Sequence, residues 1–137
     1  MWIAAVIDCE GCISFDRHKR PQGVHDRLWL RVVNTDVRLV NRLRVLAGGR
    51  ISPPRMTRKS TRPFWEWYAT TGLAKEILAA IKPYLVAKQE QAEVALEFVP
   101  IYRKGEFSRR LTVEEDTHRN EIKRRLSLLK RGVEEAV

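Results

Sequence analysis

A carboxylate stands at the end of the first apolar segment of the chain, residues 2–11, which read WIAAVIDCEG. The composition of this segment suits a short helix, and Gly11 is typical of the position just past a helix end. Glu10 would then lie at the helix C-terminus, where the partial charge is negative and a carboxylate is disfavoured. An acid in this position favours a cation as its partner.

The same segment carries small side chains at helical spacing. Ala4, Ile7 and Gly11 share one side of the expected helix. Ala5 and Asp8 lie beside them. Small residues let another backbone approach closely. The pattern indicates a helix that packs tightly against a neighbour and presents an acid at its end.

Residues 3–11 resemble the signature motif of the LAGLIDADG homing endonucleases. The match departs at Ala5, where the family usually has glycine, at Cys9, where it has alanine, and at Glu10, which replaces the second aspartate. In that family two such helices pack against each other, and their last acids bind the divalent metals that cut DNA. An ordinary amphipathic helix with an accidental acid at its end is the alternative.

A second part of the resemblance lies between residues 83 and 92. In the family, the segment after the third helix carries a Pro-aromatic-Leu run, then a lysine, then a Gln-rich helix start. Residues 83–85, Lys88 and residues 89–92 fit this order. The resemblance implies that the lysine lies beside the metal site, whereas a surface lysine at a helix start is the alternative.

The chain has 137 residues, enough for one domain with a real core and too few for two ordinary ones. It has 26 Lys and Arg against 17 Asp and Glu, a formal net charge of +9 and a pI near 10.1. This balance favours a polyanionic partner, nucleic acid rather than membrane. No apolar run reaches the roughly 20 residues of a membrane span, and the N-terminus lacks the basic flank of a secretory signal. We expect an intracellular protein, cytoplasmic or organellar, that is not secreted.

The two cysteines, Cys9 and Cys12, form a C-x-x-C pair. A structural zinc site needs four ligands, and the histidines are too scattered along the chain to complete one: His18, His25 and His118. A redox pair usually begins a helix rather than straddling its end. We therefore predict that both cysteines are small core residues.

The rest of the chain alternates between strand and helix patterns. Alternating or aromatic residues predict strands at 12–19, 28–32, near 51 and at 64–70, with a turn at 20–26. Helical spacing follows at 39–46, at 73–81 and from 83 onward, and residues 112–115 resemble a capping box that opens a last helix.

This order matches the α-β-β-α-β-β-α plan of the LAGLIDADG fold with extra C-terminal helices. The predicted fold is α+β, with an antiparallel four-stranded sheet that forms a DNA-binding saddle. We expect an endonuclease core at residues 1–99 and a basic loop and helix at residues 100–137 that pack on the same domain.

Only one copy of the motif is present, so the resemblance implies a homodimer. One Glu10 from each subunit would hold Mg²⁺, or Mn²⁺, with the carbonyl of Cys9 as a further ligand. Lys88 would organise water or stabilise the charged phosphate, and a polar position that is often glutamine in relatives falls at Asn34 or Thr35. The expected dimer contacts come from the first helix: Ala4, Ala5, Ile7 and Asp8.

The two sheets of such a dimer would form a saddle over a long, partly palindromic site in double-stranded DNA. One face of each sheet must cover its own helices, so alternate positions reach the major groove: Ser14, Asp16, His18, Trp29 and Arg31. A basic run gives either further DNA contacts or a solvated hairpin tip: Arg50, Arg55, Arg58, Lys59 and Arg62. The basic face of the last helix is equally consistent with solvation and with DNA contact.

Other functions fit the same charge. A binder on this fold without cleavage activity, either an intron-RNA maturase or a DNA-binding regulator, is the main rival. A small RNA-binding structural protein, such as a ribosomal component, gives no reason for Glu10. The joint presence of this acid and Lys88 favours the enzyme, while the extra length of glutamate relative to aspartate counts against it.

Overall fold

The computed structural model describes residues 1–20, 23–59, 62–100 and 111–132. Helices and strands follow the predicted order, with two further helices after the third, which confirms the predicted fold class. The elements are α1 (Trp2–Glu10), β1 (Gly11–Arg20), β2 (Gly23–Asn34), α2 (Val37–Ala47), β3 (Arg50–Ile51), β4 (Trp65–Thr70), α3 (Thr71–Ile81), the 3-10 helix η1 (Lys82–Tyr84), α4 (Gln89–Leu96) and α5 (Val113–Arg131).

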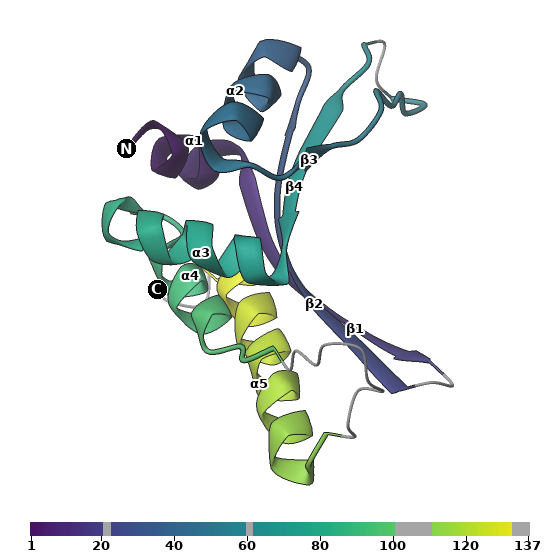
Figure 1. Ribbon diagram of the computed structural model, residues 1–137, viewed down its shortest axis with the longest axis vertical. Coiled ribbons are helices and arrows are strands. Elements are labelled where there is room, and N and C mark those ends of the chain that lie inside the picture. The colour runs from purple at the N-terminus through teal and green to yellow at the C-terminus, as the bar shows by residue number, and fades with distance from the viewer. Residues whose placement is uncertain (21–22, 60–61, 101–110, 133–137) are drawn as a thin grey trace.

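The strands form one antiparallel four-stranded sheet in the order β1-β2-β4-β3. The helices gather on one face of this sheet and leave the other face open (Figure 1). The long β1–β2 hairpin extends at one end of the sheet, with α5 on its helix side, and the β3–β4 connection extends at the other end (Figure 1). The open face is therefore flanked by two projecting arms.

Alternation along the strands decides which residues the helices cover. Side chains that point to the helices are buried: Ile13 and Phe15 on β1, Leu28, Leu30 and Val32 on β2, and Trp67 and Ala69 on β4. Residues between them are less buried and share the open face, because successive strand residues point to opposite sides. The sheet thus has one apolar face and one mixed polar face.

The first hairpin is longer than predicted. β1 and β2 pair from Gly11 opposite Val32 to Arg20 opposite Gly23, so most of the turn predicted at residues 20–26 is strand. Cross-strand partners account for the difference, since Arg17 lies opposite Asp26 and the two side chains form an ion pair. Turn-forming composition was outweighed by this pairing.

A buried ion cluster joins the hairpin to α5. The side chain of Asp26 is fully buried. Its carboxylate accepts hydrogen bonds from Nε of Arg17 at 2.9 Å and from a terminal guanidinium nitrogen of Arg119 at 2.7 Å. Arg17 also donates to the side chain of Asp116 at 2.8 Å and to Oδ1 of Asn120 at 2.7 Å. Although burial opposes its charge, these hydrogen bonds to Asp26 and Asp116 raise the pKa of Arg17.

α5 itself begins with the predicted capping box. The Thr112 hydroxyl accepts from the Glu115 amide at 3.1 Å, and the Glu115 carboxylate accepts from the Thr112 amide at 3.1 Å. Its buried residues Ile122 and Leu126 pack into the same core as the sheet. Contacts are thus continuous from β1 through α4 to α5.

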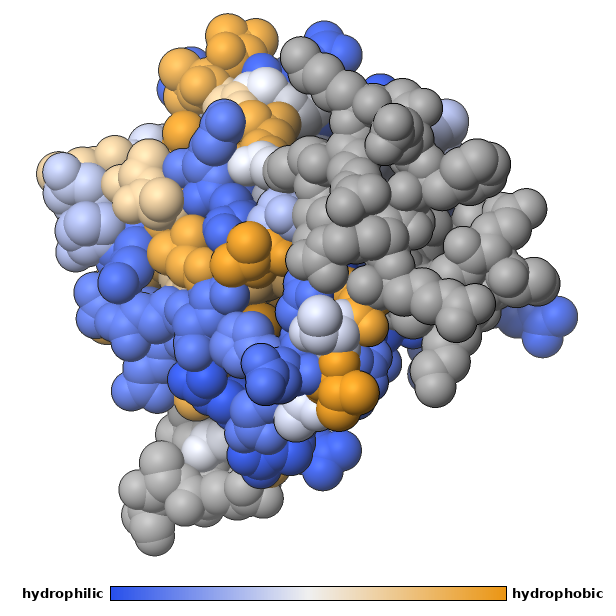
Figure 2. All heavy atoms as spheres, turned by 60° about the horizontal axis from the view of Figure 1, so that its bottom comes forward, coloured by the Kyte–Doolittle hydropathy of each residue, from blue (hydrophilic) through white to orange (hydrophobic). Residues whose placement is uncertain are grey.

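Seen from the α5 end, the surface is mainly hydrophilic, and its apolar spheres are broken up by polar ones (Figure 2). No helix among the described residues is both long enough and apolar enough to cross a membrane. The segment predicted as a basic loop at 103–110 lies outside the described residues.

We predict that Asp26→Asn destabilises the protein by about 3–5 kcal/mol, because it leaves two buried guanidinium groups without their shared anion. Equilibrium unfolding in urea measures this loss. Asp116→Asn is the matched control: its side chain is 44% exposed, so its loss should stay within about 1 kcal/mol. Equal effects of the two substitutions would contradict the role given to Asp26.

Candidate nucleic-acid interface and acidic site

α1 ends in an available carboxylate. Glu10 is the last residue of the helix, is exposed, and makes no hydrogen bond or ion pair with the described residues. The next residue, Gly11, has φ −85° and ψ 160°, so it is extended rather than left-handed. Glycine is needed there for space, since a Cβ would lie 2.6 Å from the carbonyl oxygen of Ile7.

Asp8 ties the end of α1 to the segment before α4. Its Oδ2 accepts the amide of Val86 at 2.7 Å, and its Oδ1 accepts the amide of Lys88 at 3.0 Å. In return, Nζ of Lys88 donates to the carbonyl oxygen of Asp8 at 2.7 Å. One acid therefore fixes the backbone of this segment, and the lysine side chain lies against the last turn of α1.

The hydrogen bonds of Asp8 explain why α4 begins later than predicted. Sequence alone suggested a helix that opens at Pro83, whereas η1 ends at Tyr84 and α4 begins only at Gln89. The amides of residues 86 and 88 bond to a side chain 78 and 80 positions away, so they are not available to a helix there. A long-range contact of this kind leaves no local pattern.

The strand register brings a third polar position to the same end of α1. Val32 lies opposite Gly11, so Asn34 and Thr35 follow at the level of the helix terminus. Thr35 is exposed, and Oδ1 of Asn34 accepts the amide of Asp36 at 2.8 Å. Of the residues assigned by resemblance to the acidic site, Lys88 is joined to the end of α1 by hydrogen bonds, whereas Asn34 and Thr35 are related to it only by the strand register.

Asp36 caps the N-terminus of α2. Its carboxylate accepts the Arg38 amide at 2.9 Å and pairs with the Arg38 guanidinium at 2.8 Å. Hydrogen bonds from the side chain and then the backbone of Arg38 lower the pKa of Asp36. The cap therefore stays ionised as the pH falls below the ordinary aspartate range.

The predicted burial of the cysteines is wrong. Cys9 and Cys12 are both free and exposed. Cys9 lies on the side of α1 away from the core, and Cys12 lies on an edge strand at an alternate position, where Nζ of Lys130 approaches its sulfur at 3.6 Å. Small size and apolar character did not decide their burial, because neither faces the helix-covered side of the sheet.

The helix face predicted for dimer contacts also needs correction. Ala4 and Ile7 are 1% and 0% exposed within their own subunit, so they cannot contact another. Asp8 is committed to the segment before α4. Of the predicted set, Ala5 is exposed, and the neighbouring exposed residues on its side of α1 are Trp2 and Cys9.

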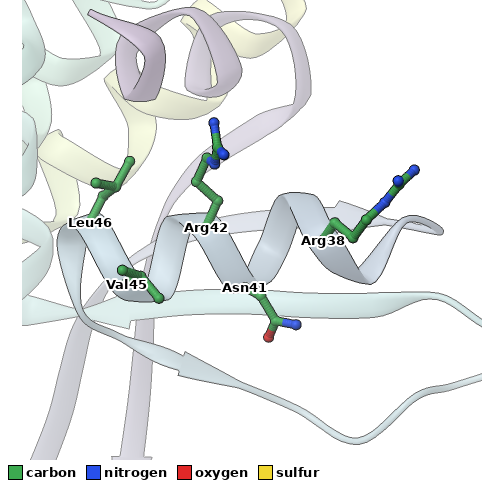
Figure 3. Close-up of a pocket in the computed structure, with 5 residues that line it drawn as sticks. All are labelled: Arg38, Asn41, Arg42, Val45 and Leu46. Atoms are coloured by element: carbon green, nitrogen blue, oxygen red, sulfur yellow. The ribbon is translucent and has the colours of Figure 1, made fainter.

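This exposed face of α1 continues onto α2. An open groove of about 560 Å³ is lined along α2 by Arg38, Asn41, Arg42, Val45 and Leu46. Arg42 and Leu46 rise from α2 on the side of α1 (Figure 3), and the guanidinium of Arg42 lies 5.8 Å from the centre of the Trp2 ring. Val45 is 79% and Leu46 58% exposed. Apolar side chains of both helices therefore adjoin on one surface.

The open face of the sheet holds all five residues predicted there by alternation: Ser14, Asp16, His18, Trp29 and Arg31. Sequence reasoning missed Glu66 and Tyr68, since it could not decide which side of β4 faces the helices. Burial of Trp67 places both neighbours on the open face. The aromatic run in β4 gave no clear alternation from which to assign them.

Arg31 lies at the centre of this face. Its guanidinium carbon is 4.3 Å from the centre of the Trp29 ring, and that ring packs against Tyr68 with centroids 5.6 Å apart. Carboxylate oxygens of Asp16 and Glu66 approach it at 3.6 and 3.7 Å. Charge and aromatic surface are thus combined within one patch.

The basic run from 50 to 62 is spread along the β3–β4 arm, and all five of its cations are exposed: Arg50, Arg55, Arg58, Lys59 and Arg62. Arg50 is in register with Tyr68 and so belongs to the open face. The backbone of Arg55 pairs with Phe64. Only the first of these cations is placed on a face by strand pairing.

Within the described part of the chain, no group of three or more His, Cys, Asp or Glu side chains could hold a metal ion. Glu10 alone supplies a free carboxylate at the end of α1. Its hard oxygen atoms suit Mg²⁺, which is often held in proteins by one or two carboxylates together with water and phosphate oxygens. The carbonyl of Cys9 accepts no hydrogen bond from the described residues, in contrast to those of Ile7 and Asp8.

The chain is similar in structure to solved homing endonucleases. It superposes on I-CvuI bound to its target DNA with a TM-score of 0.59 and 22% identity, over 70% of this chain and 62% of that one. I-TnaI gives a TM-score of 0.64 and 18% identity, over 98% and 95% of the two chains. An archaeal intron-encoded enzyme, I-Vdi141I with DNA, gives 0.54 and 14%, over 96% of both.

This likeness shows that the chain has the LAGLIDADG homing endonuclease fold, as the motif predicted. The chain spans 62% of the length of I-CvuI, whose complexes with DNA were obtained with Ca and, with the DNA not cleaved, with Mg. No protein-family model matches the sequence, and no curated protein matches it significantly.

We predict that Asp8→Ala releases the segment that carries Lys88. Amide hydrogen exchange at Val86 and Lys88 should speed up, because both amides lose their acceptor, and stability should fall by about 1.5–3 kcal/mol for each charge-assisted hydrogen bond lost. Glu10→Ala, which removes an exposed acid two residues away, should change neither measurement. Unchanged protection of the two amides in Asp8→Ala would contradict this arrangement.

Proposed function

We propose that this chain, which has the LAGLIDADG homing endonuclease fold, is a site-specific double-strand DNA endonuclease that acts as a homodimer with Mg²⁺, or with Mn²⁺ in its place. The observation that carries the proposal is the exchange between Asp8 and Lys88. It holds a lysine against the same helix end at which Glu10 stands free, at the level of Asn34 and Thr35.

Hydrolysis of a phosphodiester requires an activated water, stabilisation of the charge that spreads over the phosphate, and help for the leaving oxygen; divalent metal, when bound, supplies these. Glu10 and the carbonyl of Cys9 would hold it. Lys88 would orient water or stabilise the phosphate, with its backbone fixed by Asp8. Thr35, or Asn34 beside it, would contribute a polar group to the same position.

Two observations support a dimer. A single chain offers one free carboxylate at the end of α1, so a second subunit supplies the second acid at a twofold axis. The exposed face of α1, with Ala5, Cys9 and Trp2, adjoins the α2 groove with its exposed Val45 and Leu46. We therefore assign the interface to this combined surface in place of the face that includes Ala4 and Ile7.

The substrate would lie against the open face of the sheet. A net charge of +9 favours a polyanion. Two projecting arms in each subunit suit a long duplex whose sequence approximates the twofold symmetry of the protein. Intron RNA is the other polyanion that this basic face could bind.

The test of cleavage uses a plasmid library that carries randomised and intron-flanking DNA, incubated with the protein in Mg²⁺ or in Ca²⁺. We expect specific double-strand cuts in Mg²⁺ that Glu10→Gln abolishes and Lys88→Ala slows by about 100-fold or more, as for loss of a group that stabilises charge in the transition state. Sequencing of the cut ends maps the site.

The same experiment separates the alternatives. Binding to a defined DNA site without a cut, unaffected by Glu10→Gln, would mean that the fold serves recognition only. Absence of any preferred DNA together with tight binding of intron RNA would favour a maturase. Glu90→Gln, an exposed acid in the first turn of α4, controls for a general effect of removing charge.

The interface predicts a separate result. Ala5→Leu and Val45→Glu should each convert dimer to monomer and abolish cleavage, because one overpacks the helix contact and the other places a charge in an apolar surface. Sedimentation equilibrium reports the mass. Val113→Glu is the control, since Val113 is 84% exposed at the start of α5, away from this surface. A monomer that still cuts both strands would refute the dimeric arrangement.

A further inference from the structure

The arginines of this protein divide into two groups. Arg17 and Arg119 are nearly buried, and each donates at least two hydrogen bonds to named acceptors, such as the Asp26 carboxylate. Arg31 instead makes no hydrogen bond with the described residues, and its Nε is buried without an acceptor. Its Nε is therefore unsatisfied, although the position of the guanidinium is well defined.

Three neighbours define that position. The Trp29 ring supports the guanidinium from the sheet at 4.3 Å. Asp16 approaches a terminal nitrogen at 3.6 Å and Glu66 approaches Nε at 3.7 Å, both beyond hydrogen-bonding distance but close enough to attract the charge. The Arg31 side chain is 35% exposed, so a ligand on the open face can reach it.

The surrounding charges identify the kind of ligand group. Arg31 belongs to a cross-strand row that also includes Cys12, Tyr68 and Arg50. Two carboxylates beside it would repel a phosphate, whereas a base edge carries no net charge. Guanine presents two acceptors, O6 and N7, in the major groove, and a guanidinium donates to both at once. A stacked arginine loses less side-chain freedom on forming such a pair.

We propose that Arg31 reads a guanine at one position of each half-site, and that Asp16 and Glu66 are positioning residues that hold it for this contact. Asp16 then acts through Arg31 rather than as an independent reader. The inference rests on the proposed DNA-binding function and specifies which residue determines part of its specificity. Arg50, exposed at the sheet edge without such neighbours, is expected to meet phosphate.

The test selects duplexes from a randomised library with the full chain in Ca²⁺. Wild type should select guanine at one position in each half-site. Arg31→Gln and Arg31→Lys should each lose that preference by about tenfold while other positions keep theirs, because neither side chain can form the planar bidentate contact with guanine. The lysine variant retains the charge, so its loss assigns the effect to the planar fork.

Two further variants distinguish recognition of a base from a general effect of charge on DNA binding. Arg50→Gln should weaken binding to all sequences alike and reduce the salt dependence by about one unit of slope, as expected for a phosphate contact. Glu66→Gln removes a negative charge near DNA, so it should tighten binding to non-cognate duplexes and yet weaken the guanine preference. A merely structural role for Glu66 would not produce this opposite pair of changes.

The outcomes are decisive for each part. Two results would overturn the assignment of Arg31. One is that Arg31→Gln keeps the full base preference; the other is that wild type selects a base other than guanine at the position that the substitution affects. An unchanged guanine preference in Glu66→Gln would overturn the positioning role alone. If wild type selects no sequence from the library, the proposed DNA-binding function fails and this inference fails with it.

Discussion

The carboxylate of Asp8 holds together the elements on which the acidic site depends. It belongs to α1, yet both of its oxygens are occupied by backbone amides that precede α4. Without these bonds two backbone amides of the segment would lose their acceptor, and the bond from the Lys88 amino group to the Asp8 carbonyl would be left to join it to the end of α1. Lys88 thus lies beside the last turn of α1 because Asp8 in that turn binds the two amides that precede α4.

The sheet needs a different constraint, because β4 pairs with β2 only from Trp29 to Asn34, so the distal half of the first hairpin has no third strand beside it among the described residues. The buried Asp26 meets this need by joining a cross-strand partner, Arg17, to Arg119 of α5. Phe98 fills the space below, with its ring 4.8 Å from that of Phe15 and 4.9 Å from the Arg119 guanidinium. The C-terminal helix therefore supports the hairpin as well as covering the core.

Periodicity predicted most of the fold but could not predict what depends on contacts between distant residues. Alternation in β1 and β2 placed Ser14 and Arg31 on the open face, and the Thr112 capping box was confirmed with both of its bonds. The same reasoning failed for Ala4 and for the cysteines. The sequence of a short apolar segment does not show which of its sides packs against the rest of the chain. It also failed at residues 86 and 88, whose amides bond to a side chain 78 and 80 positions away.

The large positive charge does not by itself describe a binding surface, because several of the arginines form ion pairs with acids of the same chain. Arg17 and Arg119 share the buried carboxylate of Asp26, and Arg124 and Arg125 pair with Glu121 and Glu97 on the helical side. The cations of the open face and of its β3–β4 arm differ in kind. Those along the arm are exposed, whereas Arg31 is held against an aromatic ring between two acids. Under the proposed function, these two kinds of cation suit different contacts: the exposed arm cations suit phosphate, whereas Arg31, whose two neighbouring carboxylates lie beyond hydrogen-bonding distance, suits an uncharged acceptor.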